Sequence, residues 1–290
     1  MQQQSAATAT AEPTNRFAQI DGISLHYLDW GGDAAQRTIV MVHGGSAHAH
    51  WWDLVAPSLT PFGRVVAIDH RGHGRSQWAE VYGPASYVDD LKAFLRDHLK
   101  TRVVLIGHSM GGEISQRVAV DCPEMVEALV LVDSPHGGPP LRTRLMWRWK
   151  RRKQGGERPE FATSEELVRR FRLSPPGHNL SPADLAKLAL KGAEQLPNGS
   201  WAFRFDPKTR KLSRGWRKAV SPPIHKLRIP VLILRGEMSA LLKPSMARWM
   251  HRRIRGSKFK EIARAYHHVS LDNPQDTIAE VTEFLSSLGE

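Results

Sequence analysis

Residues 103–112, VVLIGHSMGG, constrain the fold of this chain more than any other segment. The four apolar residues predict a short buried strand, and a helix is predicted over residues 113–120. Between them, Gly107-His108-Ser109-Met110-Gly111 matches the pattern G-x-S-x-G. In such a strand-turn-helix, a nucleophile elbow, glycines let strand and helix cross closely and the serine hydroxyl is exposed at the helix N-terminus. We therefore predict that Ser109 is a nucleophile.

Predicted strands and helices alternate along most of the chain, which indicates an α/β fold. Besides residues 103–106, the runs that read as buried strands are residues 38–42, 64–68, 128–132 and 231–234. We expect a mostly parallel central sheet with helices on both faces, and an N-terminal hairpin turning at Asp21-Gly22. Ligands of such sheets bind where strands end, and Ser109 and Asp133 both follow predicted strands.

The composition divides the chain into four segments. Residues 1–15, rich in Gln, Ala and Thr, are predicted to be a disordered tail. The α/β core is predicted at residues 16–135 and 224–290. Residues 136–223 break the alternation with helical patterns and Gly-Gly and Pro-Pro pairs, so we expect an inserted helical cap, or lid.

The formal net charge of +12 raises the question of an anionic partner. Basic residues concentrate in three runs, at residues 142–153, 208–218 and 248–260. A solvated basic face accounts for them, and we expect no nucleic-acid partner because no zinc-finger or RRM motif is present. We also expect no membrane span, since no apolar run approaches ~18 residues. The single cysteine and the lack of a secretory signal favour a cytoplasmic location. The sequence does not distinguish a monomer from a homodimer.

A serine nucleophile requires a histidine base, an orienting acid and an oxyanion hole. In a fold with a nucleophile elbow the base comes after the serine in the chain. Two adjacent histidines, His267 and His268, follow the predicted strand at residues 259–262 and are the candidates.

These motifs together resemble the α/β-hydrolase family, in its lid-bearing group of bacterial serine hydrolases. The resemblance rests on His43-Gly44-Gly45, Asp69-x-Arg71-Gly72-x-Gly74-x-Ser76, Gly107–Gly112, and His267 followed by Asp272-Asn273-Pro274. It implies that His267, seven residues before that proline, is the base, and that His268 packs beside it or lines the pocket. It also implies an oxyanion hole formed by the backbone N–H groups of Gly45 and Met110.

The acid departs from the family pattern, which usually carries an Asp in the loop after the strand at residues 231–234. Here that loop, Arg235–Leu241, has no Asp, and Ser239-Ala240 stands where relatives often show Ser-Asp. Asp133, at the end of the preceding core strand, and Glu237, within the loop, are the substitutes. We favour Asp133 as the acid. The alternative is that no acid orients His267 and that the enzyme is slow or inactive.

Serine at the elbow favours acyl transfer to water, because epoxide hydrolases and haloalkane dehalogenases of this fold use Asp there. We expect hydrolysis of a carboxylic ester or related acyl bond of a small molecule through an acyl-enzyme, without cofactor or metal. The alternatives are a C–C bond hydrolase, a lactonase or a cofactor-free perhydrolase on the same site, and a catalytically silent binding protein. A basic cap would suit an anionic substrate.

Five further residues are candidates for lining the substrate pocket, besides His268. They are His43, Gly44, Trp51, Trp52 and His108. Core packing is the alternative role of the two tryptophans.

Overall fold

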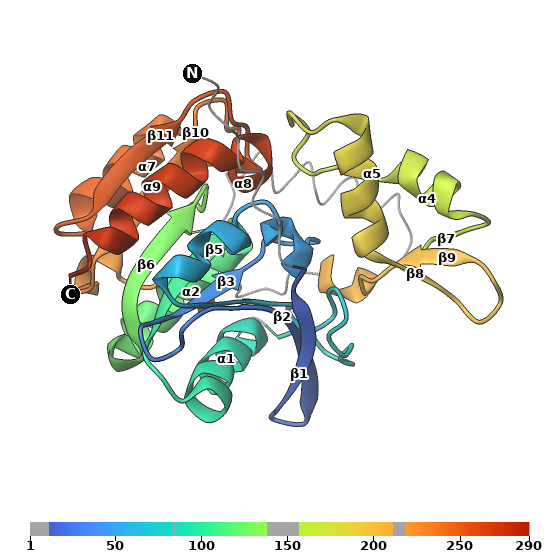
Figure 1. The fold of residues 1–290 in the computed structure, drawn as a ribbon, viewed down its shortest axis with the longest axis horizontal. Coiled ribbons are helices and arrows are strands. Elements are labelled where there is room, and N and C mark those ends of the chain that lie inside the picture. Colours follow the sequence, from blue (N-terminus) through green and yellow to red (C-terminus); the bar gives the residue numbers. More distant parts are fainter. Residues whose placement is uncertain (1–11, 84, 138–156, 211–218, 290) are drawn as a thin grey trace, which may run out of the picture.

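The computed structural model describes residues 12–83, 85–137, 157–210 and 219–289. Its centre is an eight-stranded sheet in the order β1-β2-β4-β3-β5-β6-β10-β11 (Figure 1). The strands of this sheet are β1 (Thr14–Ile20), β2 (Ile23–Gly31), β3 (Thr38–Val42), β4 (Arg64–Ile68), β5 (Val103–His108), β6 (Val126–Val132), β10 (Val231–Gly236) and β11 (Lys258–Ile262). From β4 to β11 all neighbours pair in parallel, whereas β1 and β2 are antiparallel.

Helices cover both faces of the sheet. One apolar cluster joins it to α1 (Ser86–Ala93), α2 (Met110–Asp121) and α7 (Pro244–Arg253). The opposite cluster joins it to the 3₁₀ helices η1 (Ala49–Trp52) and η2 (Ala56–Phe62) and to α9 (Pro274–Ser286). The predicted mostly parallel sheet between two helical layers is therefore confirmed.

Shorter helices complete the core. A π-helical turn, η3 (Phe94–Leu99), continues α1, and α8 (Val269–Asp272) precedes α9. The remaining single turns are η4 (Pro123–Met125), η5 (Pro207–Arg210) and η6 (Ile224–Lys226). Within the described ranges, no helix combines the length and apolarity that crossing a membrane requires.

The N-terminal hairpin forms as predicted. Asp21 and Gly22 both adopt positive φ, 46° and 77°, as a two-residue turn of this type demands. The predicted tail is too long at its end, however: β1 begins at Thr14, and Asn15 pairs with Leu28. Thr14 and Asn15 are polar and were therefore assigned to the tail, but pairing with β2 places them in a strand. Residues 1–11 lie outside the described residues.

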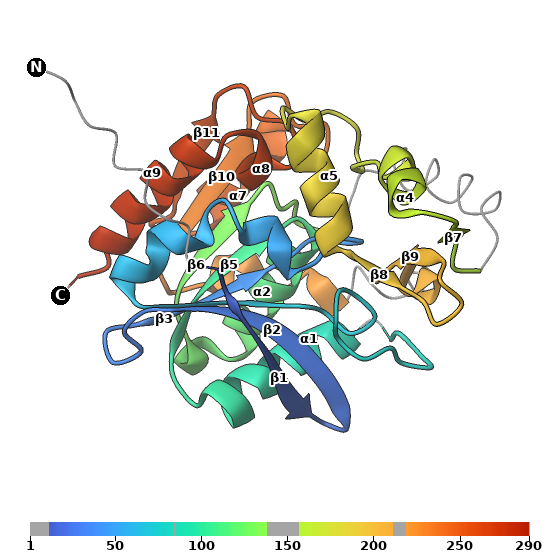
Figure 2. The ribbon, with the colours of Figure 1, turned by 45° about the vertical axis from the view of Figure 1, so that its right-hand side comes forward.

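The part of the chain predicted to be a helical cap contains strands as well as helices. Besides α4 (Ser164–Arg170) and α5 (Pro182–Lys191), its described residues form an antiparallel sheet in the order β7-β9-β8 (Figure 2). These strands are β7 (Glu160–Phe161), β8 (Ala193–Gln195) and β9 (Trp201–Phe203). The predicted cap has its helices in α4 and α5, but the small sheet was not predicted, because strands of two or three residues are too short to show an alternating pattern.

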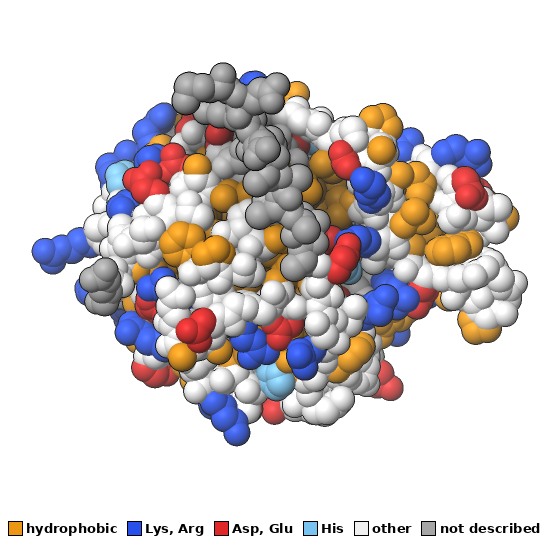
Figure 3. All heavy atoms as spheres, in the orientation of Figure 1, with side chains coloured by type: hydrophobic (Ala, Val, Ile, Leu, Met, Phe, Trp, Pro, Cys, Tyr) orange, Lys and Arg blue, Asp and Glu red, His pale blue; other side chains and the backbone are white. Residues whose placement is uncertain are grey.

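Two of the three basic runs lie mainly outside the described residues. Residues 142–153 and 211–218 are not described, whereas residues 248–260 form α7, β11 and the turn between them. There, Lys260 Nζ lies 2.9 Å from Glu280 Oε2. On the face in Figure 3, lysine and arginine side chains are interspersed with acidic ones, so this face presents no continuous basic surface.

Candidate active site

Ser109 occupies the sharp turn between β5 and α2. Its backbone, at φ 51° and ψ −120°, is in a region that non-glycine residues rarely adopt. Side chains are excluded around it: a Cβ on Gly107 would lie 2.5 Å from Gly112 Cα, and one on Gly111 would lie 2.2 Å from Val42 O. The glycines of the motif thus allow α2 to cross the strands closely, and the serine stays partly exposed.

His267 bridges Ser109 and Asp133. Its Nε2 lies 3.0 Å from Ser109 Oγ, and its Nδ1 lies 2.6 Å from Asp133 Oδ2. Asp133 follows β6, is fully buried and has φ 44°; His267 stands in the loop between β11 and α8. The structure thus brings three of the predicted catalytic residues into one hydrogen-bonded line.

The carboxylate of Asp133 has two further donors. Gly236 N–H donates to Oδ1 at 3.0 Å, and the hydroxyl of Ser239 donates to Oδ2 at 2.5 Å. Sequence reasoning placed Ser239 in the loop that usually holds the acid but assigned it no role. Nothing in a single sequence indicates a hydrogen bond between residues 106 positions apart.

Glu237, the alternative acid, is not brought to His267. Its side chain is exposed, and its Oε2 accepts a hydrogen bond from Arg264 N–H at 2.8 Å. The Glu237 backbone N–H donates to Ile262 O, beside the end of β11.

Both predicted oxyanion donors belong to segments that lie close to Ser109. Met110 is the first residue of α2, where a backbone N–H has no acceptor within the helix. The glycine loop lies against the elbow, since a Cβ on Gly44 would be 3.1 Å from Ser109 Cβ and one on Gly45 would be 3.6 Å from Met110 Sδ.

His43 holds this glycine loop rather than lining a pocket. It is fully buried, its Nε2 accepts from His70 N–H at 3.1 Å, and its Nδ1–H donates to Gly44 O at 2.7 Å. Burial, with His70 and His73 nearby, holds the pKa of His43 well below its usual value, so the ring is neutral. The placement of His43 leaves no ring face for a substrate.

A second serine missed by sequence reasoning supports the elbow. The hydroxyl of Ser134, next to Asp133, donates to the Ser109 carbonyl at 2.8 Å. It also fills the space beside α2, where a Cβ on Gly112 would lie 2.4 Å from it. The sequence signal that could have identified Ser134 is its position directly after the strand that ends at Asp133.

Two more histidines surround the base. The ring of His108 lies 4.7 Å from that of His267, and its Nε2–H donates to the His267 carbonyl at 2.9 Å. His268 Nε2 lies 3.3 Å from Pro175 O. Burial, with other histidines nearby, keeps the pKa of His108 well below normal and lowers the pKa of His268 to about 3. Both therefore remain neutral beside His267.

The two tryptophans differ in their surroundings. Trp52 is 1% exposed within the core beneath the sheet, so it packs rather than lines a pocket. Trp51 lies between the core and the cap, with its ring 6.3 Å from the rings of both His268 and Phe171.

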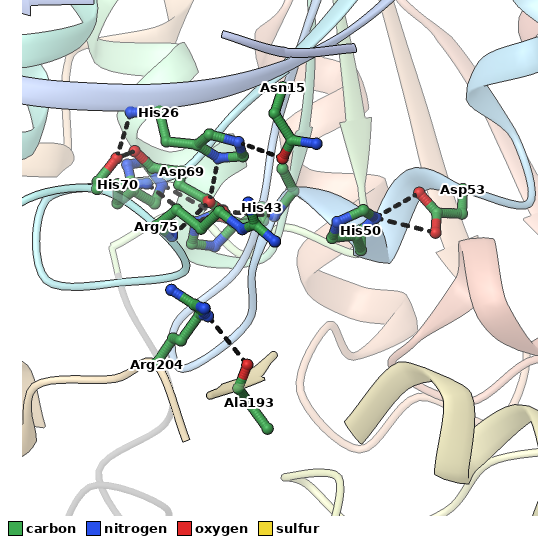
Figure 4. A network of polar contacts seen from close by, with 12 residues as sticks. Asn15, His26, His43, His50, Asp53, Asp69, His70, Arg75, Ala193 and Arg204 are labelled. Carbon is green, nitrogen blue, oxygen red and sulfur yellow. Dashed lines mark hydrogen bonds and ion pairs between the residues drawn. The ribbon is translucent and has the colours of Figure 1, made fainter. Parts of the chain in front are cut away.

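A buried network surrounds Asp69, near His26, His43 and Arg75 (Figure 4). Asp69 Oδ1 accepts from Ala49 N–H at 2.7 Å, and Oδ2 accepts from Arg75 N–H at 2.9 Å and lies 2.7 Å from His26 Nδ1. Burial alone would raise the pKa of Asp69, but the hydrogen bond with His26 and the nearby rings of His26, His43 and His48 hold it well below its usual value. The charged carboxylate thereby connects the start of η1 to the loop after β4.

Two cavities lie beside the cap, and the lining of neither includes Ser109. The larger, of about 380 Å³, is walled by aromatic, proline and charged side chains. They are Glu157, Arg158, Pro159, Phe161, Arg170, Phe203, Phe205 and Pro207. Among the residues that the structure describes, no group of three or more His, Cys, Asp or Glu side chains could hold a metal ion.

Comparison with known proteins agrees with this fold. A model described as the alpha/beta hydrolase family matches residues 39–281. The chain belongs to the α/β-hydrolase family. The predicted family is therefore confirmed.

Two relatives cover nearly the whole chain. Esterase Rv0045c from Mycobacterium tuberculosis is 27% identical over 273 residues, 92% of this chain and 88% of that protein. The 2-(acetamidomethylene)succinate hydrolase from Mesorhizobium japonicum is 24% identical over 275 residues, 94% of this chain and 95% of that protein.

Solved structures share the fold. A crystal structure of E-2-(acetamidomethylene)succinate hydrolase aligns with a TM-score of 0.80 at 22% identity, covering 94% of this chain and 99% of that one. A structure of the M. tuberculosis esterase Rv0045c aligns with a TM-score of 0.77 at 24% identity, covering 95% of this chain and 92% of that one.

Proposed function

We propose that this protein is a serine hydrolase that cleaves a carboxylic ester, or a related acyl bond, of a small molecule through an acyl-enzyme. One observation carries the proposal: Ser109 Oγ, at the tip of a strained elbow, lies 3.0 Å from His267 Nε2, and Asp133 lies 2.6 Å from the other ring nitrogen. Relatives named as an esterase and a hydrolase support the same class of reaction.

In the first half of the reaction, His267 Nε2 takes the proton of Ser109 Oγ as that oxygen attacks the carbonyl carbon. Asp133 keeps the proton of His267 on Nδ1, so that Nε2 is free to accept, and stabilises the imidazolium that forms. Negative charge develops on the carbonyl oxygen, and the proposed donors that stabilise it are the N–H groups of Gly45 and Met110.

In the second half, the leaving group takes the proton from His267 and departs, and the acyl group remains on Ser109. His267 then removes a proton from a water molecule as that water attacks the acyl carbonyl. Collapse of the second tetrahedral intermediate returns the proton to Ser109 and frees the acid.

The same machinery would serve a C–C bond hydrolase, a lactonase or a perhydrolase, so these alternatives differ from the proposal in substrate alone. A binding-only role was suggested by the missing Asp in the loop after β10. The position of Asp133, hydrogen-bonded to the Nδ1 side of His267, counts against that role.

For an anionic substrate, a supporting feature of the described cap is Arg170 in the larger cavity, whose lining does not include Ser109. Arg158 is neutralised there by Glu194, with which it forms a short ion pair. Arg170, at the last turn of α4, lines the same cavity, and no acidic partner lies within 4.0 Å of it among the described residues. Glu157 lines the same cavity and offsets part of its positive charge, so a carboxylate would be favoured only at Arg170 itself, beside the three phenylalanines.

A fluorophosphonate probe tests the proposal. We expect the wild-type protein to gain one adduct, located on Ser109 by mass spectrometry, and to hydrolyse at least one member of a short- to long-chain p-nitrophenyl ester panel. Ser109→Ala is the matched control and should neither label nor turn over. A folded wild-type protein that gains no adduct would refute a serine hydrolase.

A further inference from the structure

We infer that Ser239 is a positioning residue, which holds the Asp133 carboxylate in the orientation that His267 requires. The inference rests on the proposed role of Asp133 as the acid of the catalytic triad. In this arrangement the acid of the triad depends on two segments. The end of β6 supplies the carboxylate, and the loop after β10 supplies a hydroxyl that orients it.

The hydrogen bonds that Ser239 Oγ accepts leave its hydroxyl proton free to point only toward Asp133. A serine hydroxyl has one proton and two lone pairs. Its oxygen accepts from Leu241 N–H and from Leu242 N–H, each at 3.2 Å, so both lone pairs are used. The proton therefore points at Asp133 Oδ2, at 2.5 Å, a distance typical of a hydroxyl bonded to a carboxylate.

The loop that carries Ser239 is itself anchored. Ser239 N–H donates to Gly236 O at 2.9 Å, at the end of β10. At the other end, the buried Arg235 donates through Nε to Leu242 O at 2.7 Å and pairs with Glu261. Ser239 is 8% exposed, so water does not readily replace its hydroxyl.

Asp133 depends on this donor because Oδ2 is the oxygen that faces His267. Gly236 N–H holds only Oδ1. Without the Ser239 hydroxyl, Oδ2 keeps the His267 proton as its one partner among the described residues, and one donor fewer holds the carboxylate against rotation about its bond to Cβ. The negative charge on Oδ2 is then less dispersed, which strengthens its attraction for the imidazolium form of His267.

Ser239→Ala tests the inference, with urea unfolding to show that the variant folds. We expect kcat/KM for an ester to fall about 10- to 100-fold with KM nearly unchanged, because a hydrogen bond to a charged catalytic group is lost. Ser239→Thr, which keeps the hydroxyl, should recover most of the activity. Ser257→Ala is the matched control, since it removes a buried hydroxyl that bonds to His251, far from the triad in the fold, and should leave kcat/KM unchanged.

Two readouts separate positioning from a merely structural role. The acid limb of the kcat/KM profile reports protonation of His267, around which the titratable groups are Asp133, His108, His268 and Asp272. Ser239→Ala should shift that limb to higher pH, because the carboxylate attracts the imidazolium more strongly. The downfield proton NMR signal of His267 Nδ1–H should also move.

These experiments distinguish failure of the Ser239 inference from failure of the proposed hydrolase function. If wild-type protein hydrolyses esters and Ser239→Ala matches it in kcat/KM, acid limb and NMR signal, Ser239 has no positioning role. If wild-type protein hydrolyses no ester, the proposed function fails, while a shifted Nδ1–H signal in Ser239→Ala still supports control of the Asp133–His267 pair by Ser239.

Discussion

Two buried aspartate–histidine pairs stand at the same edge of the sheet, after strands that β3 and β5 separate. Asp133 follows β6 and lies 2.6 Å from His267 Nδ1, whereas Asp69 follows β4 and lies 2.7 Å from His26 Nδ1. Both carboxylates are at most 2% exposed, and both also accept backbone N–H groups. Chemically the two pairs are nearly the same.

They differ in what the other ring nitrogen meets. His267 Nε2 faces the hydroxyl of Ser109, which is partly exposed on a strained turn. His26 Nε2 lies 2.9 Å from Asn15 Oδ1, on the edge strand β1 (Figure 4). In the proposed mechanism, the Asp133–His267 pair takes part in catalysis because its third partner is a nucleophile that a substrate can reach. Around Asp69 the same chemistry connects loops.

The largest expected effect is a loss of activity when the acid of the Asp133–His267 pair is changed. Asp133→Asn should lower kcat on a p-nitrophenyl ester by about 10³–10⁴-fold, since the amide no longer keeps the His267 proton on Nδ1. Glu237→Gln, which alters an exposed carboxyl, should change kcat less than about twofold. A larger loss in Glu237→Gln than in Asp133→Asn would refute the assignment of the acid.

Acid pH should destabilise both regions through histidines that stay neutral when buried. Burial, chiefly, lowers the pKa of His48 to about 4 and of His70 and His268 to about 3, from 6.5. As pH falls through 6.5 the unfolded chain binds protons at these sites and the folded chain does not. Stability is thus complete above pH 6.5 and declines below it, until about pH 4 for His48 and about pH 3 for the other two.

Urea unfolding at pH values from 7.5 to 5 measures this decline. Each of the three histidines contributes a loss of up to about 1.4 kcal/mol per pH unit. His70→Gln, in the Asp69 region, should reduce the slope by about one histidine's share. A free energy of unfolding that stays flat from pH 6.5 to 5 would contradict neutral burial of these rings.

Asp69→Asn, in the Asp69–His26 pair, should lower the free energy of unfolding and have little effect on kcat. An amide nitrogen in place of Oδ2 cannot accept from Arg75 N–H, and the charge beside His26 is lost. We expect the free energy of unfolding to fall by about 3 kcal/mol. The kcat of the folded protein should fall less than about tenfold, because no reacting atom is touched. Asp97→Asn, on an exposed ion pair with Arg96, is the control and should leave stability unchanged.

The smallest expected effect concerns the cap. Arg170→Gln should raise KM about three- to tenfold for an ester that carries a free carboxylate and leave KM for its neutral analogue unchanged. Arg169→Gln, on the same helix but outside the cavity lining, provides the matched control. Equal KM values for the charged and neutral esters in wild-type protein would remove the argument for an anionic substrate.

The fold was predictable because its signals are local. The apolar run at residues 103–106, the glycines of the elbow and the Asp21-Gly22 turn each act within a few residues, and the structure has the strand, turn and hairpin there. The cap was predicted less well. Strands such as β7, of two residues, depend on pairing with β9 and leave no periodic pattern.

The amino-acid sequence by itself determined the α/β-hydrolase fold, the strained turn that exposes Ser109 and the candidate base His267. Only the tertiary structure decided which carboxylate meets that base, that His43 and Trp52 are buried, and that Ser239 bonds to Asp133. The physical reason is separation along the chain: Asp133 is 134 residues from His267 and 106 from Ser239. The parallel order β5-β6-β10 brings these strand ends together, and no local pattern records which side chains then meet.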